Sequence, residues 1–263
     1  MKKTELDAWL REQIDAFPGK VSLLMTDLIN GRHYHSFDAD TQVVSASTIK
    51  VPILLYALEQ VRQKRLSLEQ AVPVPAASIL PDTEVFELGL PEYSLWELLY
   101  WMIVESDNTA TNLVLDLLNW DEMNAYFKDT LGLRHTVCQR KMLDWDAVAA
   151  GKNNYTSAAD QERIYWALYR GTILTHDLQE KALDMLRRQR CNDSFLRYIP
   201  QPVVVAHKTG GLDHVNHDAG IFELFSHPFY LGIFTWDGPA LDGEPEQKRF
   251  IGKLAKQIYE IYG

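Results

Sequence analysis

The chain has 263 residues, of which 46% are hydrophobic and 24% charged, and it has no low-complexity tract. That composition suits an ordinary globular protein with a sizeable core, which needs neither disulfides nor a metal in order to fold. The formal net charge of −10 at pH 7 argues against a nucleic-acid binder and gives no reason to expect an anionic membrane as partner.

The amino-terminal segment MKKTELDAWLREQIDAF has two lysines followed by acidic and polar residues. A secretory signal would carry an apolar run of about seven to fifteen residues at that point. No stretch approaches the roughly twenty apolar residues of a membrane span. As it stands the sequence predicts a cytoplasmic location, and a periplasmic or secreted location requires that a leader has been removed.

The first part of the chain predicts a helix, a hairpin and a second helix. Apolar residues of helical period cover 4–17. A strand over 20–28 and a returning strand over 32–37 are joined by the strong turn signal Asn30-Gly31. A second helix is expected from about residue 47 to residue 64.

The middle of the chain is predicted to be helical and the end to return to strands. Helical periodicity covers five segments: 94–105, 109–118, 120–131, 158–170 and 177–189. Strands are expected over 203–207, 219–224 and 229–236, before a last helix over 246–262. The irregular stretch 134–155 is long for a loop in a compact domain, so it is either functional or misread. Strands near both ends predict one sheet with a helical insertion.

The cysteines and histidines give no metal or disulfide signature. Cys138 and Cys191 lie far apart without a CxxC or Cys/His cluster, so they pair only if the fold brings them together, and two lone buried thiols are the preferred interpretation. The histidines lack HExxH or another ligand spacing, and we expect no metal or other cofactor. His217 and Asp218 are interpreted as a short structural pair.

Ser47-Thr48-Ile49-Lys50 puts a hydroxyl and an amine at positions i and i+3 of an expected helix, so the two side chains share a face. A serine hydroxyl is a poor nucleophile until a base takes its proton. A lysine can be that base if burial and neighbouring charge hold it partly neutral near pH 7. The pattern occurs by chance about once in a chain of this length and has little weight alone.

Two further motifs gain meaning from their order. Ser106-Asp107-Asn108 lies between two expected helices, where these residues are favoured N-caps. Lys208-Thr209-Gly210 closes the expected strand 203–207, and His207 before it is a candidate residue at the edge of a site. The three motifs occur in a characteristic order: SxxK opens a helix, SDN lies between helices, and KTG closes a strand. Together they form the signature of class A β-lactamases and penicillin-binding proteins.

The sequence resembles that family over nearly its whole length. The resemblance includes the hairpin ending in Asn30-Gly31 and the runs ASTIKVPIL from Ala46, ESDNTATNLVLDLL from Glu105 and HKTG from His207. The segment 174–208 is also similar to the helix, loop and strand that precede KTG in the family. The sequence is therefore identified as a member of the penicillin-recognising serine enzymes.

The resemblance implies a two-domain fold of the β-lactamase/transpeptidase type. An α/β domain, discontinuous over 1–47 and 191–263, would hold a five-stranded antiparallel sheet with flanking terminal helices. An all-α domain would span 48–190. The active site would lie between the two domains.

The resemblance also implies the roles of individual residues. Ser47 would attack an acyl carbonyl, Lys50 would accept its proton, and Ser106 would relay a proton to the leaving nitrogen. The implied substrate-binding residues are Asn108 for an amide side chain, Lys208 and Thr209 for a carboxylate, and Gly210 and Gly211 beside them. Backbone N–H groups of Ser47 and Gly211 would form an oxyanion hole, in which each donor contributes roughly 3 kcal/mol.

One position departs from the family pattern. Fast β-lactamases carry a loop glutamate that activates the water which clears the acyl-enzyme. Here Arg140 fits the loop-anchoring arginine, but Met142 stands where the glutamate is expected. Asp144 and Asp146 are candidate substitutes, yet aspartate is one methylene shorter and their register is wrong. A surface or helix-cap role is the preferred interpretation of both carboxylates.

The resulting hypothesis is a class A β-lactamase-type serine hydrolase, acylated at Ser47 by β-lactams or related amides and esters and slow to deacylate. The alternatives are a D-Ala-D-Ala peptidase or esterase on the same fold, and a non-hydrolytic binding or sensor module. Met142 favours these alternatives over a fast β-lactamase. The missing leader disfavours any of them that must meet cell-wall substrates outside the membrane. The expected partner is a small acyl substrate, without nucleic acid or membrane, and the expected state is a monomer.

Overall fold

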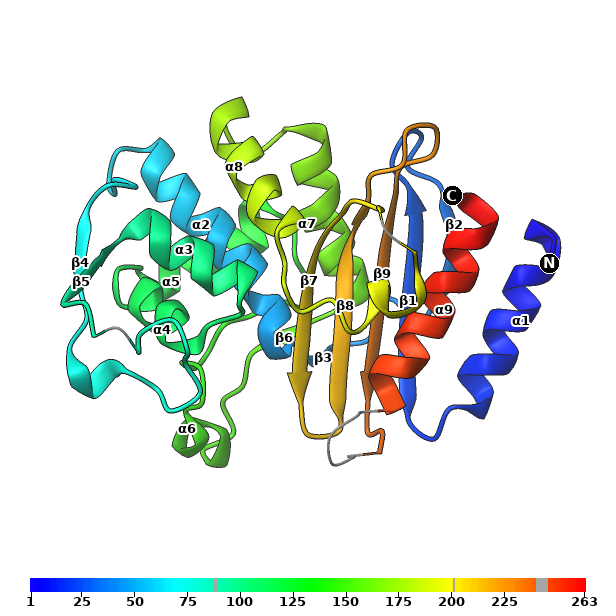
Figure 1. Ribbon diagram of the computed structural model, residues 1–263, viewed down its shortest axis with the longest axis horizontal. Helices are drawn as coiled ribbons and strands as arrows, with labels where there is room; N and C mark the ends of the chain where they lie inside the picture. The colour runs from blue at the N-terminus through cyan, green and yellow to red at the C-terminus, as the bar shows by residue number, and fades with distance from the viewer. Residues whose placement is uncertain (88, 201, 240–245) are drawn as a thin grey trace.

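The computed structural model describes residues 1–87, 89–200, 202–239 and 246–263. A helical half and a sheet half lie side by side, with both termini at the outer end of the sheet half (Figure 1). The sheet has five strands in the order β2-β1-β9-β8-β7, and every neighbouring pair is antiparallel. The predicted fold class is thereby confirmed. The strands are β1 (Lys20–Asp27), β2 (His33–Phe37), β7 (Val205–Leu212), β8 (Val215–Phe222) and β9 (Phe229–Trp236).

The two ends of the chain meet in the middle of this sheet. β1 pairs with β9 along its whole length, from Lys20 opposite Trp236 to Asp27 opposite Phe229. Both strands are almost entirely buried, because one face of the sheet packs on helices from the chain termini and the other on the helical half. This burial on both faces explains their nearly continuous apolar sequence.

Two helices cover the outer face of the sheet. α1 (Lys3–Ala16) and α9 (Glu246–Tyr262) lie side by side there, with α9 nearer to the helical half (Figure 1). Leu6 and Leu10 of α1 and Ile251 of α9 are fully buried in the core that these helices form with the sheet. Burying a leucine or isoleucine side chain contributes about 1.5–3 kcal/mol, which fixes these helices on the sheet.

The inner face of the sheet packs on the helical half. Its helices are α2 (Lys50–Arg62), α3 (Leu95–Val104), α4 (Asn108–Asp116), α5 (Trp120–Ala125), α6 (Trp145–Ala149), α7 (Ala158–Arg170) and α8 (His176–Arg187). Paired short strands also occur: β3 (Val43–Val44) with β6 (Tyr155–Thr156), and β4 (Ala71–Pro73) with β5 (Glu92–Ser94). α2 is buried from Lys50 to Gln60, so it is the central helix of this half. The 3₁₀ turn that carries Ser47 runs directly into α2, so this buried helix fixes the position of the turn.

Three sequence predictions need correction. Ser47 lies in the 3₁₀ turn Ala46–Ile49, and α2 begins only at Lys50, since helix N-termini often tighten into 3₁₀ geometry. KTG does not close its strand, because β7 stays paired with β8 as far as Leu212. The helix expected over 120–131 divides into α5 and the π-helical turn Tyr126–Thr130.

Several other predictions have clear outcomes. Helices α7 and α9 have the predicted limits, and the irregular stretch 134–155 contains only the short helix α6 and the start of β6.

Cys138 and Cys191 are both free thiols, and only Cys138 is fully buried. The division at 47/48 and 190/191 into two domains stays a prediction. Within the described ranges no helix is both long enough and apolar enough to span a bilayer.

Candidate active site

Ser47 lies where the helical half meets the edge strand β7. The 3₁₀ turn that carries it begins with Ala46, whose φ of 44° is left-handed. Gly210 of β7 faces this turn so closely that a Cβ there would lie 3.0 Å from the Ser47 backbone nitrogen and 3.1 Å from the Ala46 Cβ. Contacts at those distances are tighter than nearly all Cβ contacts in proteins, so a side chain at position 210 would push the Ser47 turn away by a few tenths of an ångström. Glycine as the third residue of KTG lets the strand approach the serine without that shift.

A cavity of about 250 Å³ opens beside Ser47. The helical half contributes Ser106 and Asn108 to its wall, and β7 contributes Thr209, Gly210 and Gly211. The remaining lining residues are Cys191, Asp193, Ser194, Asn216, His217 and Lys248. The three motifs recognised in the sequence thus meet around one cavity.

The Lys50 side chain is completely buried and contacts two residues of the cavity wall. Its Nζ donates to the Ser106 carbonyl at 2.6 Å, to the Ser106 Oγ at 3.3 Å and to the Asn108 Oδ1 at 2.8 Å. Burial, reinforced by the charge of Lys208, holds the pKa of Lys50 well below its usual value. Among the described contacts the amine faces Ser106 and Asn108, and it makes no hydrogen bond with the Ser47 hydroxyl. A buried lysine of lowered pKa is suited to accept a proton.

Ser106 links the two buried lysines. Its Oγ accepts a 2.9 Å hydrogen bond from Lys208 Nζ, which also donates to the Thr209 carbonyl at 2.8 Å. Ser106 has a φ of 58°, an uncommon conformation for a residue with a side chain, between the end of α3 and the start of α4. Burial lowers the pKa of Lys208 to about 8. Both amines thus contact one hydroxyl, which can pass a proton between them and the cavity.

Asp107 and Asn108 fix this arrangement on α4. The Asp107 carboxylate caps α4 by accepting from the Ala110 N–H at 2.7 Å, and it also accepts from the Thr83 hydroxyl. Asn108 is held at both ends of its amide. Its Oδ1 accepts from Lys50, and its Nδ2 donates to Asp82 Oδ2 at 2.6 Å. Asp82 lies in a loop and belongs to no motif, so no sequence pattern indicates this contact.

The histidines near β7 do not make the contacts expected from the sequence. Asp218 pairs with His207 and not with its neighbour His217: its Oδ1 lies 2.7 Å from His207 Nδ1, and both side chains are buried. In a strand, neighbouring residues point to opposite faces, so 217 and 218 cannot share a partner surface. Burial lowers the pKa of His217 to about 4, so this cavity-lining ring is neutral at pH 7.

The 134–155 loop has no carboxylate on the cavity wall. Met142 is buried, and Asn112 of α4 fixes its backbone, accepting from its N–H at 2.7 Å and donating to its carbonyl at 3.2 Å. Asp144 is the N-cap of α6, where it accepts from the Ala147 N–H at 2.9 Å, and Asp146 is exposed in the first turn of the same helix. Arg140 is buried and donates to Asn153 Oδ1 at 2.9 Å, as a loop anchor would.

Sequence reasoning missed residues that reach the cavity from distant segments. Lys248, in the first turn of α9, forms an ion pair with Asp193 on the cavity wall. Cys191, one of the two free thiols, lies on the same wall. No local pattern marks these positions, because only the packing of α9 and of the segment after α8 brings them to Ser47.

The fold and the motif geometry agree with the comparisons to known proteins. The family described as "Beta-lactamase enzyme family" matches residues 3–262, so the chain belongs to that family and is a β-lactamase-type serine hydrolase. A β-lactamase of Rhodobacter capsulatus is 26% identical over 223 residues, which cover 84% of this chain and 75% of the relative. The extended-spectrum β-lactamase PER-1 of Pseudomonas aeruginosa is 24% identical, covering 82% of this chain and 74% of that protein.

Solved structures of PBP-A and of a class A β-lactamase have the same fold as this chain. The structure of PBP-A has a TM-score of 0.87 and 26% identity, and the match covers 98% of this chain and 95% of PBP-A. A mutant of PBP-A, solved as an acyl-enzyme complex with penicillin G, is equally similar, with a TM-score of 0.87. An ancestral class A β-lactamase has a TM-score of 0.88 at 20% identity, which is evidence for the shared fold alone.

Proposed function

We propose that this protein is acylated at Ser47 by β-lactams or related amides and esters, and that it releases the acyl group slowly. The observation that carries the proposal is that Ser47 and Ser106 line one cavity, and that the buried amines of Lys50 and Lys208 both donate to Ser106. Relatives named β-lactamases, and the PBP-A mutant that forms an acyl-enzyme with penicillin G, support the same chemistry.

In the proposed acylation, the Ser47 Oγ bonds to the lactam carbonyl carbon, and the lactam C–N bond breaks. The proton of Ser47 passes to the neutral amine of Lys50, and the leaving nitrogen takes a proton from Ser106, which Lys50 or Lys208 replenishes. Both amines contact Ser106, at 3.3 and 2.9 Å. A positioned base of this kind contributes typically 10²–10⁴-fold to a rate. The backbone N–H groups of Ser47 and Gly211 would stabilise the developing oxyanion.

The same cavity offers recognition groups for a carboxylated substrate. Lys208 and Thr209 would bind the carboxylate, and the cavity wall also carries the ion pair of Lys248 with Asp193. The amide of Asn108 would hold the acyl side chain. His217 would not contribute charge, since burial lowers its pKa to about 4 and leaves it neutral at pH 7.

We expect slow release of the acyl group because position 142 is a methionine. Hydrolysis of the ester adds water across the Ser47 acyl bond, giving a free acid and the regenerated hydroxyl, and the water needs a base. The buried thioether of Met142 cannot accept a proton, and Asp144 is engaged as a helix cap. The acyl-enzyme is therefore expected to persist after acylation.

Intact-mass measurement after incubation with benzylpenicillin tests the proposal. Wild-type protein should gain the mass of one penicillin and hold it, and Ser47→Ala should gain none. Digestion should locate the added mass on the peptide that contains residue 47. Wild-type protein that neither gains mass nor forms penicilloate would contradict acylation, and rapid appearance of free penicilloate without an adduct would contradict slow release.

A peptidase or esterase activity on the same fold is the second candidate, and Met142 is the observation that favours it. An acyl-enzyme that water clears slowly remains available to other acyl acceptors, and small acyl groups leave more room for water. A D-Ala-D-Ala peptide and a small thioester, assayed beside the penicillin, separate these activities. Turnover of the thioester with a stable penicillin adduct would favour an esterase, and no reaction with any donor would favour a binding or sensor module.

A further inference from the structure

We propose that one end of the sheet half is a docking surface for an anionic lipid bilayer. Two loops form this surface: residues 28–32, which join β1 to β2, and residues 223–228, which join β8 to β9. The loops lie side by side, since the Leu28 N–H donates to the Pro228 carbonyl at 3.0 Å. In Figure 1 both loops lie at the upper end of the sheet. The proposal does not depend on the acylation of Ser47.

Each loop presents a large apolar side chain to solvent. Phe225 is fully exposed, at 108%, and Ile29 is 56% exposed. The turn that carries Ile29 is firmly held, because the Asp27 carboxylate accepts from the Ile29 N–H and from the Tyr34 hydroxyl, each at 2.7 Å. Removing apolar side chains of this size from water is favourable. A fixed turn that keeps isoleucine in solvent therefore offers a preformed contact to an apolar partner.

Three exposed cations surround the two loops. Arg32 is the last residue of the first loop. Arg170 lies over the Trp166 ring at 5.7 Å, and that ring packs on Gly31, where a Cβ would lie 3.1 Å from it. Lys3 shares a small cavity with the second loop. None of the three takes part in an ion pair among the described residues. A lysine or arginine near a bilayer strengthens its attraction to anionic lipid by about fivefold.

The acids in and beside the two loops are engaged within the protein. Asp27 is buried in the first turn, where it accepts the hydrogen bonds described above. Glu223 lies 3.0 Å from Arg187 in an ion pair. Glu162 of α7 has a side chain that is only 14% exposed, and it lies 3.9 Å from His33. This end of the sheet therefore turns cations outward while its carboxylates are paired or buried.

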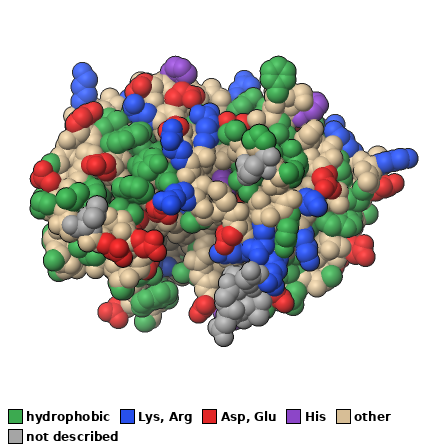
Figure 2. All heavy atoms as spheres, in the orientation of Figure 1, with side chains coloured by type: hydrophobic (Ala, Val, Ile, Leu, Met, Phe, Trp, Pro, Cys, Tyr) green, Lys and Arg blue, Asp and Glu red, His purple; other side chains and the backbone are tan. Residues whose placement is uncertain are grey.

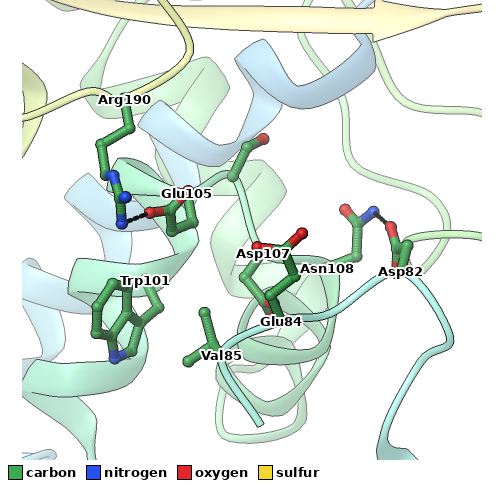
Figure 3. A pocket seen from close by; sticks show the side chains of 9 residues that line it. Asp82, Glu84, Val85, Trp101, Glu105, Asp107, Asn108 and Arg190 are labelled. Carbon is green, nitrogen blue, oxygen red and sulfur yellow. Dashed lines mark hydrogen bonds and ion pairs between the residues drawn. The ribbon is translucent and has the colours of Figure 1, made fainter. Parts of the chain in front are cut away.

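Acids gather in a different part of the molecule. Figure 3 shows a cleft of about 440 Å³ in the helical half, whose wall carries the carboxylates of Asp82, Glu84, Glu105 and Asp107. Figure 2 shows acidic side chains low on the helical half, whereas hydrophobic and basic side chains protrude together at the upper edge of the molecule. The net charge of −10 taken alone argues against an anionic partner. Charges more than about 10 Å away are largely screened at about 0.1 M salt, so the local cations decide the attraction.

The shape of the surface favours a bilayer over a folded protein as the partner. A stable protein interface buries about 800 Å² on each side as one patch. Two side chains that protrude from separate loops do not form such a patch. A bilayer accepts protruding apolar side chains one at a time, and its anionic headgroups meet the cations around them.

Contact through these loops leaves the Ser47 cavity open to water. Gly210 on the cavity wall pairs with His217 of β8. The second loop begins after Phe222, about 17 Å further along that strand. The protein would therefore stand on the bilayer with its cavity exposed.

Co-sedimentation with unilamellar vesicles tests the proposal. Wild-type protein at about 0.1 M salt should bind phosphatidylcholine vesicles that contain about 30% phosphatidylglycerol about tenfold more tightly than vesicles of phosphatidylcholine alone. Raising the salt concentration to about 0.5 M should remove most of that difference. Phe225→Ser should weaken binding to the anionic vesicles about tenfold, and Arg32→Gln about fivefold.

Trp145→Ser and Lys152→Gln are the matched controls. Trp145 is 57% exposed, as Ile29 nearly is, and Lys152 is an exposed cation, and both belong to the helical half. Both variants, and Ser47→Ala, should bind vesicles as wild type does. Equal binding to the two kinds of vesicle, or binding that survives Phe225→Ser combined with Ile29→Ser, would overturn the proposal. Wild-type protein that binds no vesicles but self-associates through Phe225 would assign the surface to a second copy and overturn it as well.

Discussion

Two regions near Ser47, the surroundings of Lys50 and the 134–155 loop, differ in whether they contain a side chain that can act as a base. Around Lys50 the basic side chains are well connected: the Lys50 amine donates to Ser106 and Asn108, and Lys208 also donates to Ser106. The 134–155 loop is just as well anchored, through Asn112 and Arg140, yet it carries Met142 at the position of a base. Good packing and hydrogen bonding therefore do not distinguish the two regions, and only the chemistry of the side chains does.

This difference predicts that the two half-reactions of the proposed function, acylation and release of the acyl group, can be changed separately. Acylation would depend on the SxxK, SDN and KTG residues, and water-driven release on one loop position. Substitutions in one region should therefore change one rate and spare the other.

The largest effect is expected from Lys50→Ala. Loss of the buried amine removes the proposed base, and acylation by benzylpenicillin should slow by about 10³-fold. Intact mass against time measures the rate. Lys152→Ala, which removes an exposed lysine of the 134–155 loop, is the control and should react as wild type does. An unchanged acylation rate in a folded Lys50→Ala protein would contradict the assignment.

Met142→Glu should produce the next largest effect, in the opposite half-reaction. A carboxylate at this position can accept a proton from water, and loss of the penicillin adduct should accelerate by about 10²-fold. Met142→Gln has nearly the same shape without the basic group, so its adduct should persist. Equal decay of the adduct in both variants would show that the loop residue does not limit release.

The pH profile of acylation should fall on the alkaline side near pH 8. Carboxylate recognition needs protonated Lys208, and burial lowers its pKa to about 8, so each pH unit above that value removes about tenfold of the rate. Lys50 acts as the neutral amine and is not lost as the pH rises. Lys208→Arg, whose charge persists, should move the fall to higher pH. A rate that stays constant to pH 10 would refute a recognition role for Lys208.

The smallest rate effect is expected from Asn112→Ala. The two hydrogen bonds that fix the Met142 backbone are lost, which should lower the free energy of unfolding by about 2 kcal/mol. Acylation should stay within about threefold of wild type, because Lys50 and Ser106 keep their partners. Denaturant unfolding and the acylation rate check both halves of this prediction. A large loss of acylation would mean that the two regions are coupled.

The sequence allowed most of the sheet and the centre of the site to be predicted, because both leave local signals. The apolar run of Lys20–Asp27 and the helical period of Ala158–Arg170 agree with the structure to within a residue. The strands β3, β4 and β5 were missed, since two or three residues are too few to reveal a period of two. The sequence pattern predicts that the strand ends at Gly210, whereas the pairing of β7 with β8 continues through this residue.

The missed parts of the site depend on tertiary contacts. Asp82 reaches Asn108 from a loop, and Lys248 reaches the cavity from the last helix. Aspartates and lysines at such positions are usually solvated, so sequence alone gives no reason to select them. Met142 stands out only by comparison with the family pattern, which has a glutamate at this position.

The burst of product from a chromogenic cephalosporin tests the central claim most directly. Rapid mixing of wild-type protein with excess reagent should release close to one equivalent per active site, followed by a phase limited by release of the acyl group. The size of the burst counts acylated serines, and the second phase measures hydrolysis. Linear turnover on the order of hundreds per second, without a burst, would contradict the account, since it requires an efficient base for water that the described residues do not supply.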